Sequence, residues 1–117
     1  PLEGLYEPVE SREFRLKILA EDFRAAGTAV LDSLAEYAKE QPGWSIAPDN
    51  CEGVRVNLDK AHGDGWFLLR LSLHDPILPL NIESDREHGA RTIARELAPF
   101  LAQQTEIDAS SALEFTL

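Results

Sequence analysis

The stretch WFLLRLSLHDP, residues 66–76, joins a strong strand signal to an unusual run of polar side chains. Its first four residues are all apolar, which predicts a strand covered on both faces and therefore central in a sheet. Arg70, Ser72 and His74 follow at every second position, which is the period of a β-strand. A guanidinium, a hydroxyl and an imidazole at one strand end could together grip a phosphate. Pro76 then ends the loop by fixing its own φ. The alternative is a solvated strand end at which Arg70 pairs with an acid.

Alternating apolar and polar residues predict further strands at residues 12–18, 53–59 and 77–83, around the central strand at 66–72. Each would bury one face. The turn between the second and third strands contains two glycines, which can take a positive φ, so we expect a hairpin there. Pro79 has no backbone N–H to donate to a neighbouring strand, which predicts an open edge on the last of these strands.

Two helices are predicted at residues 22–40 and 85–101, because apolar side chains recur there at the helical period. Asp22 is a candidate N-cap for the first helix. Ser84 and Glu87 have the spacing of a capping box at the start of the second.

The resulting order is strand, helix, three strands, helix. It predicts an α+β fold of two layers, with an antiparallel sheet of about four strands and two helices on one face. Residues 12–101 would form this domain. We expect residues 1–11 to be an interdomain connector, residues 44–52 a loop, and residues 102–117 a tail whose end at 113–117 could add one short strand.

Composition narrows the classes of function. A chain of 117 residues is long enough for one domain with a core. A net charge of −10 argues against nucleic acid as a partner, because such binding depends on clustered Lys and Arg. No run approaches the roughly 20 apolar residues of a membrane span, and no signal peptide is visible, so we expect no membrane partner. The single cysteine, Cys51, fits a reducing, cytoplasmic compartment. The chain has no methionine and starts at Pro1, which suggests a piece of a longer or processed chain.

The sequence also contains residues that could form a metal site or a cysteine nucleophile. His62 and Asp64 could bind a metal with His74 and Asp75 if Cys51 joined them, but zinc sites usually show tighter local spacing. Ordinary turn polarity explains these residues equally well. No nearby base marks Cys51 as a nucleophile.

Two segments carry a resemblance to a known family. Residues 52–58, EGVRVNL, and residues 65–84, GWFLLRLSLHDPILPLNIES, resemble the last domain of the α-D-phosphohexomutases, which include phosphomannomutase/phosphoglucomutase enzymes. The family pattern there is a DG(V/L)xV strand, a GW strand, an Arg-x-Ser-x-Thr-Glu-Pro loop and a further strand. The predicted elements before and after follow the same order, so the resemblance covers roughly residues 9–101.

The resemblance implies a function. These enzymes interconvert hexose 1-phosphates and 6-phosphates. Their first three domains supply a phosphorylated serine, a magnesium site and a sugar-reading loop, and the fourth, of a TATA-binding-protein-like fold, closes over the cleft and holds the substrate's phosphate. This chain would therefore bind a hexose phosphate or bisphosphate and contact the other domains of a parent chain. The parent's magnesium would be held by those domains, and no catalytic residue would lie in this one.

The resemblance also assigns site residues. Arg70 and Ser72 match the loop arginine and serine, and both would hold the phosphate that is not transferred. Leu73 stands where Asn or Gly is common, His74 where threonine is usual, and Asp75 where glutamate is usual. The amide of Leu73 and the imidazole of His74 could add donors. The altered loop leaves open a second hypothesis, a non-catalytic binding module that recruits a peptide at the open edge near Pro79.

Overall fold

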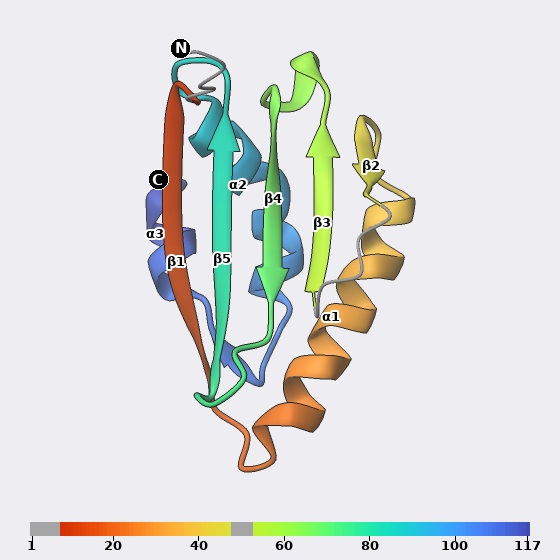
Figure 1. The fold of residues 1–117 in the computed structure, drawn as a ribbon, viewed down its shortest axis with the longest axis vertical. Helices are drawn as coiled ribbons and strands as arrows, with labels where there is room; N and C mark the ends of the chain where they lie inside the picture. Colours follow the sequence, from red (N-terminus) through yellow and green to blue (C-terminus); the bar gives the residue numbers. More distant parts are fainter. Residues whose placement is uncertain (1–7, 48–52) are drawn as a thin grey trace.

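The apolar run at 66–69 lies in β4 (Gly65–Arg70), which sits inside the sheet between two antiparallel neighbours, β3 (Gly53–Leu58) and β5 (Ile77–Ser84). The computed structural model describes residues 8–47 and 53–117. In these ranges the fold is α+β, with the antiparallel strand order β2-β3-β4-β5-β1-β6 (Figure 1).

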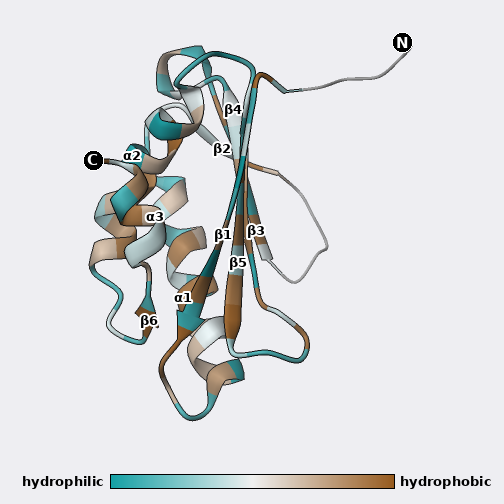
Figure 2. Ribbon diagram, turned by 90° about the vertical axis from the view of Figure 1, so that its left-hand side faces the viewer, coloured by the Kyte–Doolittle hydropathy of each residue, from teal (hydrophilic) through white to brown (hydrophobic). Residues whose placement is uncertain are grey.

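The remaining elements complete two layers. They are β1 (Glu10–Ile18), α1 (Phe23–Lys39), β2 (Trp44–Ile46), a 3-10 turn η1 (Lys60–His62), α2 (Gly89–Ala102), β6 (Ile107–Asp108) and α3 (Ser110–Phe115). Figure 2 shows the sheet nearly edge-on, with α1, α2 and α3 all on one side of it. Among the described residues the opposite face of the sheet carries no helix. No helix in these ranges has the length and apolar character needed to cross a bilayer.

The core fills the space between the sheet and the helices. Its largest fully buried apolar side chains come from the predicted strand and helix faces: Leu16, Leu34, Val56, Phe67, Leu69, Leu78, Leu80, Ile82, Ile93 and Leu97. The predicted N-cap is confirmed, since the Asp22 carboxylate accepts a hydrogen bond from the Ala25 N–H at 3.1 Å. Gly27 allows α1 to approach the sheet closely, because a Cβ there would lie 2.7 Å from a methyl carbon of Leu71.

The sheet is larger than predicted. It has six strands in the described residues, not about four, and three α-helices, not two. The prediction of a loop at 44–52 missed β2 at its start, and residues 48–52 lie outside the described ranges. The added strand of the tail is β6, whereas residues 113–117, where a strand was predicted, include the end of α3. β2 and β6 have three and two residues, too few to show a period in the sequence.

The predicted capping box of α2 is wrong, because Ser84 belongs to β5 and is buried there. Its hydroxyl donates to the Gly63 carbonyl at 2.6 Å, and α2 begins only at Gly89. The carboxylate of Glu10 takes the capping role instead, accepting from the N–H groups of His88 and Ala90 at 2.9 and 3.1 Å. Glu10 was expected in the connector, of which residues 1–7 lie outside the described ranges.

The predicted open edge at Pro79 is also wrong. β5 lies between β4 and β1, and Pro79 pairs with Arg15 of β1. The pairing of β5 with β4 ends at Leu69 and Leu80. Because hydrogen-bonding directions alternate along a strand, the missing N–H of Pro79 faces β4. The two strands lose one hydrogen bond there, and the Ser72 N–H still donates to the Ile77 carbonyl further along in the same register.

Candidate functional site

The loop that follows β4 is built as a tight reversal into β5. The Ser72 N–H donates to the Ile77 carbonyl at 3.0 Å, and the Ile77 N–H donates to the Asp75 carbonyl at 2.7 Å. The Ile18 N–H donates to the Pro76 carbonyl at 2.7 Å, which ties the loop to the end of β1. The reversal therefore has a defined conformation set by its backbone.

Strand alternation decides which way each side chain of this segment points. Leu71 is buried on the helical side, where it contacts Gly27 of α1. Arg70 and Ser72 flank it in sequence and so lie on the face of the sheet that the helices leave uncovered. The two residues that the resemblance assigns to a phosphate thus share one surface.

That surface contains a small cavity of about 120 Å³. Its lining combines the loop with two strands: Glu13, Arg15, Arg70, Ser72, Asp75, Ile77 and Pro79. The structure therefore brings together three of the five predicted site residues, Arg70, Ser72 and Asp75. The other two, Leu73 and His74, are exposed and do not line the cavity, and the side chain of Leu73 is 55% accessible.

Several donors in and beside the cavity are available to a ligand. The Ser72 hydroxyl oxygen accepts from the Asp75 N–H at 3.4 Å, which leaves its own proton free to point elsewhere. Within residues 8–47 and 53–117, the backbone N–H groups of Leu73 and His74 have no hydrogen-bond partner. Both residues are exposed to solvent.

The charges of the cavity are balanced but not paired. Two guanidiniums, of Arg15 and Arg70, share it with two carboxylates, of Glu13 and Asp75. No described carboxylate lies within 4.0 Å of either guanidinium. Among the described residues, therefore, Arg70 does not pair with a neighbouring acid, which was the alternative to a phosphate-binding role.

Arg24, which has no recognisable motif around it in the sequence, supports the loop from the helical side of the sheet. Its guanidinium donates to the Leu73 carbonyl at 2.6 Å, across 49 positions in the chain. Arg24 lies in the first turn of α1, on the other side of the sheet from the cavity. Since this contact depends on how α1 packs, no local pattern could have predicted it.

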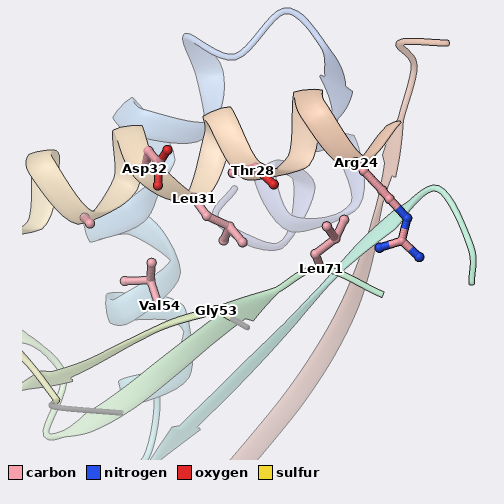
Figure 3. Close-up of a pocket in the computed structure, with 8 residues that line it drawn as sticks. Arg24, Thr28, Leu31, Asp32, Gly53, Val54 and Leu71 are labelled. Carbon is pink, nitrogen blue, oxygen red and sulfur yellow. The ribbon is translucent and has the colours of Figure 1, made fainter. Parts of the chain in front are cut away.

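A larger cavity of about 490 Å³ lies behind the same loop, between α1 and the ends of β3 and β4. Figure 3 shows Leu31, Val54 and Leu71 pointing into it, with Arg24 at one end. Its lining is mixed, and it contains Asp32 and Thr28 beside these apolar side chains. It contributes to the candidate site only through Arg24.

The two histidine and aspartate pairs considered as metal ligands lie apart. His62 and Asp64 precede β4, and His74 and Asp75 follow it, so the length of a strand separates them. The Asp59 carboxylate is 2.6 Å from the His62 ring, and this hydrogen bond raises the pKa of His62 above its ordinary value. No three His, Cys, Asp or Glu side chains in the described part of the chain are grouped to hold a metal. Cys51 lies outside the described residues.

Comparison with known proteins adds no family to this geometry: no protein-family model matches the chain, and no curated protein matches it.

Proposed function

We propose that this chain is the substrate-phosphate-binding domain of a phosphohexomutase, an isomerase that interconverts hexose 1-phosphates and 6-phosphates of mannose or glucose by intramolecular phosphoryl transfer. One observation carries the proposal. Arg70 and Ser72, the two residues that the resemblance assigns to the phosphate, line the same cavity, beside two backbone N–H groups without described partners.

In this function the domain binds and positions its substrate without making or breaking bonds. The fork of Arg70 takes two phosphate oxygens, and the Ser72 hydroxyl and the loop amides take others. Holding the phosphate that is not transferred orients the sugar for attack and excludes water when the domain closes. Exposed amides and a hydroxyl are suited to a substrate that must bind in two orientations.

The rest of the proposal concerns the parent protein. Other domains of a longer, cytoplasmic chain would supply the phosphorylated serine and the magnesium site, and the described residues offer no group of ligands for that metal. The two-layer α+β architecture is compatible with a TATA-binding-protein-like fold. The isolated domain is not expected to have mutase activity.

The alternative of a peptide-binding module depended on an open strand edge near Pro79. Since β5 has a neighbour on each side, that edge does not exist, and the altered loop is the motive that the alternative keeps.

The test is an amide NMR titration of the 117-residue chain with glucose 6-phosphate and mannose 6-phosphate, with glucose as the uncharged control. The proposal predicts shifts centred on residues 70–76 for both phosphates and none for glucose. Affinity should be weak, in the millimolar range, because one domain supplies only part of the contacts (about −4 kcal/mol). Arg70→Gln should abolish the shifts. Shifts confined to sites far from this loop would reject the proposal.

A further inference from the structure

Arg15 of β1 and Arg70 of β4 lie on the same face of the sheet, on the two strands that flank β5, with Pro79 of β5 between them. Arg15 is paired with Pro79 across β1 and β5. The β4–β5 register, whose last pair is Leu69 with Leu80, places Arg70 beside Pro79 from the other direction. With strands about 4.8 Å apart, the two arginine backbones are about 10 Å apart. That distance suits an anion held between two long side chains.

Pro79, the residue between the two arginines, forms the bottom of the cavity. Pro79 is buried, and its short ring carries no polar group that could compete for the ligand. The cavity sits over Pro79 and Ile77, and both guanidiniums belong to its lining. An anion seated here would therefore meet apolar atoms below and a guanidinium at each side, with the carboxylates of Glu13 and Asp75 also at the cavity wall.

Arg15 has no other visible task. Its side chain is exposed, and within the described ranges it forms no ion pair and no hydrogen bond. Arg15 has no acidic partner among these residues although the chain has 21 acidic and only 11 basic residues. By contrast, Arg12 of the same strand packs over the ring of Phe115, and Arg24 holds the loop carbonyl of Leu73.

We propose that Arg15 is a second phosphate-binding residue, and that the paired guanidiniums make this a site for the dianion of a phosphate monoester. The inference rests on the proposed function and deepens it. One guanidinium with hydroxyl and amide donors would suffice for a singly charged sulfate ester. Two guanidiniums match the charge of a dianion and present forks to its oxygens from two directions.

The experiment compares glucose 6-phosphate with glucose 6-sulfate in NMR titrations of the 117-residue chain at constant ionic strength. Arg15→Gln should weaken glucose 6-phosphate binding about tenfold, as expected for charge-assisted hydrogen bonds, and should largely remove the preference for phosphate over sulfate. Arg15→Lys keeps the charge but loses the fork, so an intermediate affinity is expected.

Lys17→Gln is the matched control. Lys17 is two residues along β1 on the same exposed face, and it does not line the cavity. A charge about 7 Å from the phosphate acts through space alone, so Lys17→Gln should weaken binding about two- to fivefold, less than the tenfold loss expected for Arg15→Gln. Both positions are exposed, and unchanged amide signals elsewhere would confirm that each variant is folded.

The outcomes separate the inference from the function on which it rests. If Arg15→Gln resembles Lys17→Gln while Arg70→Gln abolishes binding, the role of Arg15 is refuted and the proposed function stands. If the wild-type chain gives no phosphate-dependent shifts at residues 70–76, or Arg70→Gln changes nothing, both are refuted. An unchanged preference for phosphate in Arg15→Gln would refute the assignment of the dianion.

Discussion

Replacing Glu13 by Gln should strengthen phosphate binding. Glu13 lines the cavity two residues from Arg15 on β1, on the same exposed face. Its carboxylate would therefore lie about 7 Å from a phosphate seated over Pro79, since a strand advances about 3.4 Å per residue. Like charges repel, so removing this one lowers the free energy of the complex.

The size of the effect follows from Coulomb's law. A dianion and one carboxylate about 7 Å apart repel by about 1.2 kcal/mol at the dielectric constant of water. Screening at physiological salt reduces this to about 0.5 kcal/mol, and halving the dielectric constant doubles it to about 1 kcal/mol. Glu13→Gln should therefore bind glucose 6-phosphate about two- to fivefold more tightly.

The assay is an NMR or calorimetric titration at about 0.15 M salt, where the Debye length is about 8 Å. Glu83→Gln is the matched control. Glu83 pairs with Ser11 at the far end of the same sheet face, four residues along β5 from Pro79 and so about 14 Å away. By the same range of dielectric constants it should alter the affinity by no more than about 1.4-fold. Equal effects of the two variants, or weaker binding by Glu13→Gln, would refute this placement of the phosphate.

Three further predictions concern the framework around the site. Hydrogen bonds from the backbone N–H groups of His88 and Ala90 hold the pKa of Glu10 below its ordinary value of 4.5, so its contribution to stability is present above that value and is lost as the pH falls through the lowered pKa. Glu10→Gln should cost about 1 kcal/mol in denaturant unfolding at pH 7 and flatten that acid dependence, and an unchanged midpoint would contradict the capping role. The hydrogen bond from Asp59 raises the pKa of His62 above 6.5, so its contribution is present below 6.5 and is lost as the pH rises through the raised pKa. Asp59→Asn should bring the NMR titration of His62 back toward 6.5, and an unmoved midpoint would show that the contact is not formed in solution. Arg24→Ala removes the donor to the Leu73 carbonyl and should shift the loop amides at 72–76 and weaken glucose 6-phosphate binding several-fold, whereas an unperturbed loop would show that it needs no support from α1.

Residues that bury one face were predictable from the sequence. Apolar and polar residues alternate along β1, β3 and β5 because one side of each strand packs on the helices. The apolar run of β4 indicates that this strand lies inside the sheet. The stripe of α2 is also visible in the sequence. In each case the signal is local, since a strand or helix face carries its own period.

Features that depend on distant partners were not predictable. β2 and β6 are too short to show a period, and α3 has six residues. The start of α2 was misplaced because Ser84 hydrogen-bonds to Gly63, 21 positions away, and does not cap the helix. The edge prediction at Pro79 failed because an interior strand can lose a single N–H: β4 and β5 lack one hydrogen bond there, and the Ser72 N–H still donates to the Ile77 carbonyl beyond it.

Some residues of the candidate site were predictable from the sequence and others were not, for the same reason. Arg70 and Ser72 share a face through strand alternation, which the sequence shows directly. Arg15 and Arg24 reach the loop and its cavity only through the register of β1 with β5 and the packing of α1. The sequence spacing alone would place His74 on the same face. The chain has already turned toward β5 at that point, so His74 does not line the cavity.

A crystal structure of the chain with glucose 6-phosphate at high concentration tests the central claim most directly. The account predicts phosphate density over Pro79, with oxygens within about 3 Å of the Arg70 guanidinium and the Ser72 hydroxyl. A phosphate bound elsewhere, or an Arg70 side chain paired with Glu13 or Asp75 while the ligand is excluded from the cavity, would contradict it.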